Sequence, residues 1–304
     1  MATKQFIFDF YSCDTNVSQA NVTQQNSHQV FQNLLDTFQA SPEGTVKDVG
    51  RHLLEIRDIR ATTYGFKGIF GKHRRNNLPH AAVAGGTERE LPLAPNENLL
   101  EKAHFTFYTQ NSLLVIQRNR FCANADVLGH FLSPANHVTM LNPIIEPASL
   151  AWLANNRVRV KVAKINVAKP RNPELLRELN HDFNNSLLNT LNGTNSAQLN
   201  LVFRGDTRSD DPEERYLDNS FKRALRELQE TLDVTKLDLT TENEDTMVEH
   251  PIDLVSDRLK HFDNVSMNGR YPDSFDMWDK LEDAKNTKQD ELNNFFGLPG
   301  DQLD

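Results

Sequence analysis

Residues 156–171 read NRVRVKVAKINVAKPR, in which basic residues and valines alternate until the pattern slips by one position at Ala163. Strict alternation predicts a strand with one apolar and one basic face, and a β-bulge explains the slip. The basic side chains of this strand are Arg157, Arg159, Lys161 and Lys164, and the row continues with Lys169 and Arg171. No acidic residue occurs within the stretch, so the sequence predicts a row of unopposed positive charge.

The positive charge is concentrated in the first two thirds of the chain, although the 304 residues together have a formal net charge of −9. Residues 205–304 contain 26 acidic and 12 basic side chains, whereas residues 1–204 contain 16 acidic and 21 basic ones. Such asymmetry is typical of proteins with a surface for a polyanion, but acidic helices also keep a protein in solution. We expect a basic α+β domain over 1–204 and an acidic, mostly helical region over 205–304. The second region either packs on the first as one unit or forms a separate one.

A second basic cluster lies among aromatic residues and glycines in residues 64–75, YGFKGIFGKHRR. Its basic side chains are Lys67, Lys72, His73, Arg74 and Arg75. Residues 64–70 are predicted to form a strand and residues 71–77 a basic turn. Alternate residues of a strand lie about 6.6 Å apart, close to the spacing of phosphates along one nucleic-acid strand, so either cluster can contact a backbone. A solvated strand face and a solvated turn are the alternatives without function.

The whole pattern predicts an α+β fold, with a mixed, largely antiparallel sheet, flanking helices and a helix-rich acidic C-terminal third. Strands are expected at residues 5–11, 51–60, 64–70, 104–108, 113–118, 156–171 and 199–203, with an edge strand at 237–239. Helices are expected at residues 30–38, 98–102, 124–132, 172–191, 221–232, 251–262 and 273–296. The two strands within 104–118 form the clearest hairpin.

Several classes of protein are disfavoured by composition. No run of about 18 apolar residues is present, so no membrane span is expected. Cys13 and Cys122 form no CxxC motif, which favours buried thiols in the reducing cytoplasm. The ten histidines have no HxH or HExxH spacing and no glycine pair has the spacing of a phosphate-binding loop, so neither a metal nor a cofactor is expected.

One catalytic motif competes with these binding hypotheses. Arg75 and His80, in RNNLPH, have the Arg-x4-His spacing of the HEPN ribonucleases, whose two side chains act on the scissile phosphate from one helix. Pro79 directly precedes the histidine here and disrupts such a helix. A ribonuclease is therefore the minor alternative, and we expect a protein that is not an enzyme.

Several stretches together resemble the RexA-type phage-exclusion proteins, the sensor half of the lambdoid RexAB system, and their prophage relatives. These stretches are FIFDFY (6–11), FTFYTQNSLLVIQRNR (105–120), ADVLGHFL (125–132), RVRVKVAKINVAKP (157–170), LNLVFRGD (199–206) and the helix expected around 254–262. The resemblance implies an α+β homodimer that binds double-stranded DNA with little sequence preference, acts in phage exclusion and signals to a membrane-protein partner. The acidic C-terminal third departs from the basic balance expected of such a protein.

We therefore expect a cytoplasmic, non-enzymatic DNA-binding protein of a phage-defence or phage-exclusion system. The expected phosphate contacts are Arg157, Arg159, Lys161, Lys164, Lys169 and Arg171 on the strand, and Lys67, Lys72, Arg74 and Arg75 in the second cluster. The alternative is an interaction module, in which the acidic residues 205–304 mimic nucleic acid or dock a basic DNA-processing protein of the host or the phage.

Overall fold

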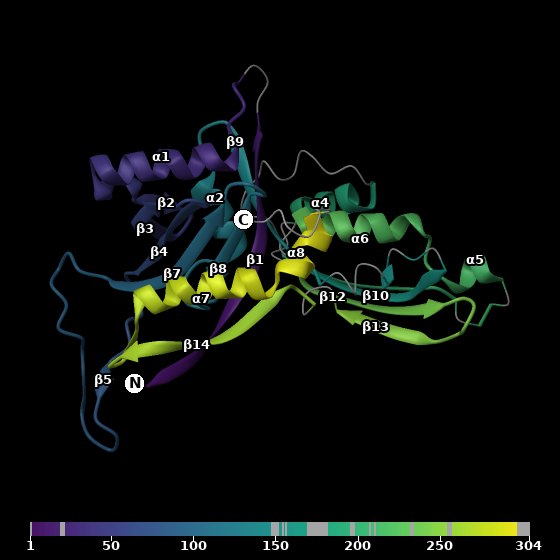
Figure 1. Ribbon diagram of the computed structural model, residues 1–304. Helices are drawn as coiled ribbons and strands as arrows, with labels where there is room; N and C mark the ends of the chain where they lie inside the picture. The colour runs from purple at the N-terminus through teal and green to yellow at the C-terminus, as the bar shows by residue number, and fades with distance from the viewer. Residues whose placement is uncertain are drawn as a thin grey trace.

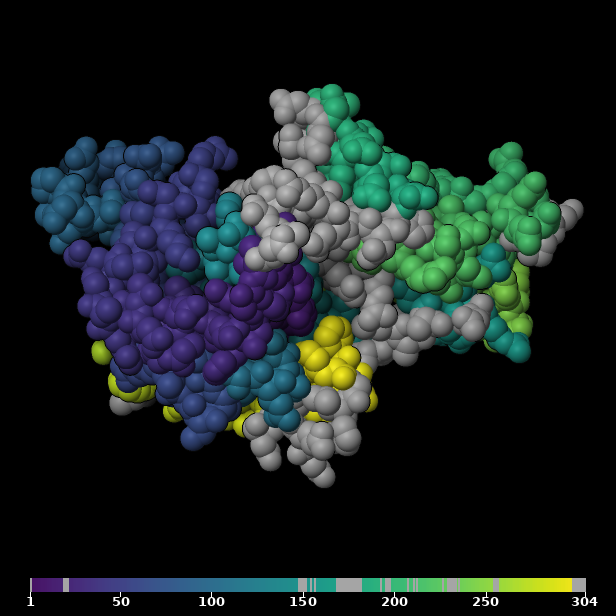
Figure 2. All heavy atoms as spheres, turned by 90° about the horizontal axis from the view of Figure 1, so that it is seen from above, coloured from purple at the N-terminus to yellow at the C-terminus, as the bar shows by residue number. Residues whose placement is uncertain are grey.

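The computed structural model describes residues 2–18, 22–146, 152–153, 155, 157–168, 182–194, 198–206, 208–209, 211–231, 234–253 and 257–296. These residues form two antiparallel sheets and a short ribbon, with helices packed on both sheets. The fold is therefore α+β, as the sequence predicts. Figure 1 shows the two sheets side by side, and Figure 2 shows the same two lobes from above. None of the described helices is long and apolar enough to cross a membrane.

The larger sheet has the strand order β15-β14-β1-β8-β7-β4-β3-β2 in the described residues, and β9 also pairs with β1. Its strands are β1 (Thr3–Val17), β2 (Lys47–Val49), β3 (His52–Ala61), β4 (Gly65–Arg74), β7 (Leu99–Tyr108), β8 (Leu113–Gln117), β9 (His137–Pro143), β14 (Lys260–Asn268) and β15 (Tyr271–Pro272). The long strand β1 pairs with β14 near its start and with β9 near its end. A small ribbon, β5 (Ala81–Ala82) and β6 (Glu88–Arg89), lies between β4 and β7 in the chain.

Helices cover both faces of the larger sheet, because its central strands carry apolar side chains on both sides. These helices are α1 (Ser27–Ala40), the short 3-10 helix η1 (Pro42–Thr45), α2 (Ala125–Leu132), α7 (Ser274–Thr287) and α8 (Gln289–Phe296). On the α1 face, the ring centroid of Phe31 lies 5.6 Å from that of Phe105 and 4.2 Å from that of Phe107. On the α7 face, Trp278 joins a buried cluster with Phe8 of β1. Figure 1 shows α1 above this sheet and α7 below it.

The smaller sheet has the order β11-β10-β12-β13 and helices on one face. Its elements are β10 (Val158–Ala168), α4 (Asp182–Gly193), β11 (Gln198–Arg204), α5 (Pro212–Arg215), α6 (Ser220–Thr231), β12 (Val234–Asn243) and β13 (Glu249–Asp253). Ile165 and Leu237 of the sheet are buried against Leu188 of α4 and Leu225 of α6. The opposite face is solvated, since Val202 is 56% exposed there.

The smaller sheet is inserted between β9 and β14 of the larger one. The chain leaves and returns by adjacent segments: the amide of Glu146 donates to the carbonyl of Asp257 at 2.9 Å, and that of Leu259 donates to the carbonyl of Ile144 at 2.7 Å. We call β10–β13 with α4–α6 the inserted unit. The division expected between residues 204 and 205 falls within this unit, between β11 and α5. Residues 260–296 return to the larger sheet as β14, α7 and α8.

Several local expectations are confirmed. The strand at the N-terminus, the hairpin of β7 and β8, and the helices α1 and α2 lie where the periodicity places them. Asn124 caps α2, since its side chain accepts a hydrogen bond from the amide of Val127 at 3.1 Å. Cys13 and Cys122 are buried free thiols, and burial raises the pKa of Cys122 to about 11.

Residues 71–74 continue β4 rather than forming a basic turn, and residues 99–102 begin β7 rather than forming a helix. The two errors have one cause, because these segments pair with each other. Gly71 lies opposite Lys102, and Arg74 lies opposite Leu99. Local helix and turn preferences are weak, and the hydrogen bonds of this long ladder override them.

The helix expected at 251–262 is also wrong, because residues 251–253 and 260–262 belong to strands of two different sheets. Pro251 lies in β13, an edge strand, where a missing backbone donor is tolerated. β14 then begins at Lys260 and pairs with β1. With β13 at the edge, β12 lies between two strands, so the edge strand expected at 237–239 is an inner one. The helix start expected at 172 lies outside the described residues.

Candidate nucleic-acid interface

β10 contains the predicted bulge, two residues earlier than the pattern indicates. Its register with β12 shifts between Val160 and Val162, so Lys161 is the extra residue. Val160 and Ala163 are both buried in the core that the helices of the inserted unit form with this sheet. The slip therefore keeps the basic side chains before and after it on the face opposite that core, as the sequence predicts.

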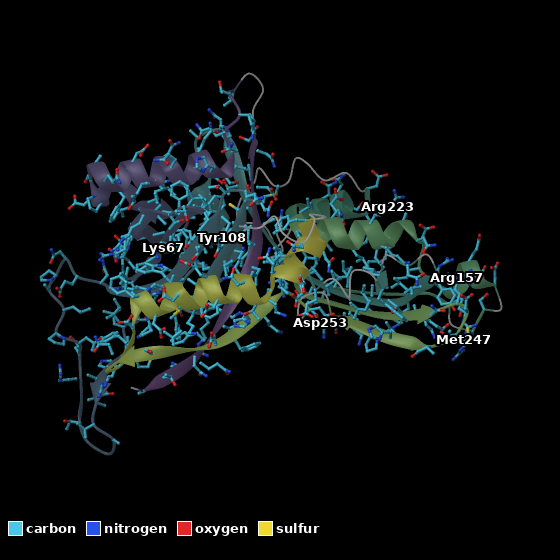
Figure 3. All side chains as sticks on the ribbon, in the orientation of Figure 1. Lys67, Tyr108, Arg157, Arg223, Met247 and Asp253 are labelled. Carbon is cyan, nitrogen blue, oxygen red and sulfur yellow. The ribbon has the colours of Figure 1, made fainter. Side chains whose placement is uncertain are left out.

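Acidic side chains around the turn between β12 and β13 neutralise the first three basic residues of this row. The ion pairs are Arg157–Asp245, Arg159–Glu244 (Nη1–Oε1 3.1 Å), Lys161–Glu242 (Nζ–Oε2 2.9 Å) and Lys161–Glu249 (Nζ–Oε1 2.6 Å). The partners follow Lys161 by 81 or more residues, so a scan for nearby acids does not find them. In Figure 3, Arg157 lies at the end of the inserted unit where Met247 marks this turn.

Glu242 is the centre of this network and is only 3% exposed. Its Oε1 accepts a hydrogen bond from the hydroxyl of Tyr216 at 2.5 Å, and its Oε2 contacts Lys161. Burial acts to raise the pKa of Glu242, but the hydrogen bonds from Tyr216 and Lys161 outweigh it, so this pKa lies below its ordinary value. The pKa of Lys161 is raised by its hydrogen bonds to Glu249 and Glu242. The pairs satisfy one another, which weakens the case for β10 as a phosphate-binding strand and for these carboxylates as a dock for a basic partner.

Among the described residues, Lys164 is the next basic residue of the predicted row, and it is not part of this ion-pair network. Lys164 is exposed, and no carboxylate of a described residue forms an ion pair with it. Lys169 and Arg171 lie outside the described residues. A single exposed lysine on an open sheet face is typical of a solvated surface.

The second predicted cluster is dispersed along β4 and the segment after it. Lys72 Nζ donates to the carbonyl of Cys122 at 2.6 Å, and Arg74 donates to the carbonyl of Asn77. The other basic side chains of the cluster contact carboxylates: Lys67–Glu282 at 3.8 Å, His73–Glu55 at 3.1 Å and Arg75–Asp48 at 2.8 Å. Lys67 also lies over the Trp278 ring. Figure 3 shows Lys67 far from Arg157, so the two predicted clusters do not form one surface.

The ribonuclease motif does not lie on a helix. Arg75 directly follows β4 and pairs with Asp48, and His80 lies in the irregular segment before β5. The geometry that brings two such side chains to one phosphate from a shared helix is therefore not present in residues 75–80, which are all described.

A basic groove of about 610 Å³ lies at another place, where strands of the larger sheet begin and end near the N-terminus. The first residues of β1 and β7, the end of β8, the turn between β14 and β15 and the start of α7 line it. Its charged lining residues are Lys4, Lys102, Arg118, Arg120, Arg270 and the single acid Glu101. In Figure 1 this end of the sheet lies where the N-terminus and the tip of β14 meet.

Most cations of this groove form no ion pair with a carboxylate in the described part of the chain. Arg118 is the exception, since its Nε lies 2.7 Å from Oδ2 of Asp9, which is buried. The four others are exposed, and no carboxylate of a described residue forms an ion pair with them: Lys4, Lys102, Arg120 and Arg270. The groove therefore holds a concentration of positive charge that β10 does not, and a concave surface of one sign attracts anions.

Aromatic rings lie among these cations. The guanidinium of Arg120 lies 4.6 Å from the ring centroid of Phe121, and Nζ of Lys4 lies 5.7 Å from that of Phe6. The side chain of Phe121 is 47% exposed, and that of Tyr271 is 77% exposed. Both rings are therefore accessible to a ligand that enters the groove.

A buried histidine holds the floor of the groove together. His104 Nδ1 lies 2.9 Å from Oε1 of Gln117, and its Nε2 lies 3.0 Å from Oγ of Ser274. These contacts join β7, β8 and the first turn of α7. Burial lowers the pKa of His104, so it is neutral near pH 7 and adds no charge to the groove. Its role is to position the elements that carry the cations.

The groove residues are missed by the sequence analysis because they come from four strand ends, at positions 4, 102, 118–121 and 270–271. Two local signals point to them. The run RNRF at 118–121 places two arginines beside a phenylalanine, and GRY at 269–271 places an arginine beside a tyrosine. Neither is recognisable as a site until β1 brings the two segments together by pairing with both β8 and β14.

Comparison with known proteins places the chain among relatives without assigning an activity. Residues 1–290 match a protein family described as a family of unknown function, DUF6731. No curated protein matches the chain. The geometry of the groove therefore has to carry the functional argument.

Proposed function

The chain belongs to the DUF6731 family, and we propose that it is a non-enzymatic protein that binds nucleic acid through phosphate contacts in its basic groove. The observation that carries the proposal is the group of four exposed cations, Lys4, Lys102, Arg120 and Arg270, without ion pairs in the described residues of a concave site. Contacts of this kind bind the phosphate backbone of a nucleic acid and give little preference for base sequence.

The contrast with β10 supports the choice of site. A cation that already pairs with a carboxylate has to break that pair before it binds a phosphate, so the net gain is small. Lys161 is such a cation, since it lies between Glu242 and Glu249. An unpaired surface cation can displace the counterions condensed on a nucleic acid without breaking a pair of its own, and this release favours binding at low salt.

The experiment is a gel-shift series with the full chain, duplex DNA, single-stranded DNA and RNA in reducing buffer at moderate salt. A triple variant, Lys102→Glu, Arg120→Glu and Arg270→Glu, should weaken binding to every nucleic acid by at least roughly tenfold, because it replaces three attractive charges with repulsive ones. Circular dichroism checks that the variant is folded.

The matched control is Lys164→Glu, which reverses an exposed lysine on β10 and should leave the affinity unchanged. Two results speak against the proposal. One is wild-type protein that binds none of the three nucleic acids at low salt. The other is a folded triple variant that binds as tightly as the wild type, together with a Lys164→Glu variant that binds more weakly. That result would place the binding site on β10.

We further propose, on the resemblance to RexA-type proteins alone, that this binding serves phage exclusion, with a homodimer as the active form and a membrane protein as partner. The same resemblance implies double-stranded DNA as the ligand, which the gel-shift series compares with single strands and RNA. Phage plating on cells that express the wild type or the triple variant tests this. We expect fewer plaques on cells with the wild type than on cells with the triple variant. Equal plating on these two strains and on cells without the protein would contradict this proposal.

A further inference from the structure

The two most exposed rings of the groove are Tyr271 and Phe121. Tyr271 is 77% exposed and lies in the short strand β15, directly after Arg270. Phe121 is 47% exposed and follows Arg120, whose guanidinium packs over it. The Phe121 ring therefore contacts a cation directly, and Arg270 is the chain neighbour of Tyr271. All four residues line one groove.

This pairing of ring and cation fits the two parts of a nucleotide. A base has an apolar face that stacks on an aromatic ring, and its phosphate carries the charge that an adjacent arginine attracts. In a duplex, base faces are stacked on one another and unavailable, so exposed rings gain nothing from it. A phosphate chain without bases likewise uses only the cations.

The shape of the site agrees with this assignment. A groove of about 610 Å³ is large enough for a nucleotide segment but too small to hold a double helix. Reading a duplex needs an element that projects into one of its grooves. Here the cations and rings lie inside a groove of the protein, so the nucleic acid has to enter it.

We propose that the groove binds single-stranded nucleic acid, with bases stacked on Tyr271 and Phe121 and phosphates on Arg120, Arg270, Lys4 and Lys102. This inference rests on the proposed function, because it names the form of nucleic acid that the same site takes. Stacking tolerates any base, so the preference is for single strands and not for a sequence.

Fluorescence anisotropy with the full chain and a labelled oligothymidylate of about ten nucleotides tests the inference. A duplex of equal length, thymidine monophosphate and inorganic polyphosphate serve as competitors. The single strand should bind at least roughly tenfold more tightly than the duplex. Tyr271→Ala and Phe121→Ala should each weaken the affinity for the single strand by about 5- to 100-fold. The inhibition constant of polyphosphate should stay unchanged, because only a base can stack.

Phe262→Ala is the ring control, since Phe262 is also 47% exposed but does not line the groove, and it should change nothing. Duplex binding as tight as single-strand binding, or ring variants without effect, overturns the inference and leaves the proposed function standing. Thymidine monophosphate that binds as tightly as the strand overturns it in favour of a mononucleotide site. If none of the probes binds in a salt-sensitive way, the proposed function itself is overturned.

Discussion

At the scale of single residues, Glu242 decides how the basic strand is interpreted. It is nearly buried, accepts a hydrogen bond from Tyr216, and pairs with Lys161. Loss of this carboxylate removes one of the two acidic partners of Lys161, whose side chain is only 12% exposed. The basic face of β10 is therefore part of the sheet's own structure, and its charges stabilise the fold.

A substitution of Glu242 tests this structural role. Glu242→Gln should lower the free energy of unfolding by about 1–3 kcal/mol near pH 7, because Lys161 and Tyr216 lose a charged acceptor. The pKa of Glu242 is depressed in the folded state, so its contribution is present above the ordinary value of 4.5 and is lost as the pH falls below it.

Urea unfolding between pH 7 and pH 3 measures both effects. The stability difference between wild type and Glu242→Gln should be largest near neutral pH and shrink toward pH 3. A difference that grows on acidification would mean that the carboxylate is destabilised by folding, contrary to the network described.

At the scale of elements, α7 links the C-terminal part of the chain to the groove. Asp273 caps this helix, since its side chain accepts hydrogen bonds from the amides of Phe275 at 2.9 Å and Asp276 at 3.0 Å. The next residue, Ser274, contacts His104 on the groove floor. The cap therefore fixes both the helix start and one wall of the site.

Removal of the cap should affect stability by a predictable amount. Asp273→Ala should cost about 1 kcal/mol of unfolding free energy, because two backbone donors lose their acceptor. Asp279→Ala, an exposed position on the same helix, should cost less than half as much. Thermal denaturation of the two variants compares them, and equal losses would contradict the capping role.

The elements that the sequence predicts are those whose signal is local. β1, α1, α2 and the hairpin of β7 and β8 follow from period-two or period-3.6 spacing within one segment. The start of β7 and the strand β14 do not, because their pairing partners lie far away in the chain. β13 pairs with the preceding strand β12, but Pro251 within it is typical of a helix start. The spacing around 251–262 mimics a helix only because two strands from different sheets follow each other.

The same distinction explains the site. The bulge in β10 is predictable, because alternation within eleven residues records it. The ion pairs that neutralise this strand are not, since they join residues 81 or more positions apart. The groove is not either, since its cations come from three parts of the chain, at positions 4, 102–120 and 270. A sequence shows which residues are charged, but the fold decides which charges meet.

At the scale of the whole molecule, the inserted unit and the larger sheet are joined by two adjacent segments. Residues 144–146 and 257–259 run antiparallel, with Ile145 bridged to Arg258. The groove lies entirely in the larger sheet and its helices. A protein without the inserted unit can therefore keep the site, provided that the two segments are joined by a short turn.

Replacement of residues 147–256 by a Gly/Ser turn should give a folded, monodisperse protein that retains the groove. Single-strand affinity should stay within roughly threefold of the wild type, because none of the groove cations is removed. Size-exclusion chromatography and anisotropy measure the two properties. A folded deletion variant without binding would locate the interface in the inserted unit, where the sequence alone places it.

The most direct test of the account is the salt dependence of single-strand affinity for the wild-type chain. Four groove cations that contact phosphates predict a slope of about −3 in a plot of log K against log salt concentration, from about 0.7 released counterions per contact. The triple variant Lys102→Glu, Arg120→Glu and Arg270→Glu should reduce this slope to about −0.7, the contribution of the remaining Lys4, and Lys164→Glu should leave it unchanged. A slope near zero for the wild type, or one that only Lys164→Glu lowers, would contradict a phosphate-binding groove at this end of the sheet.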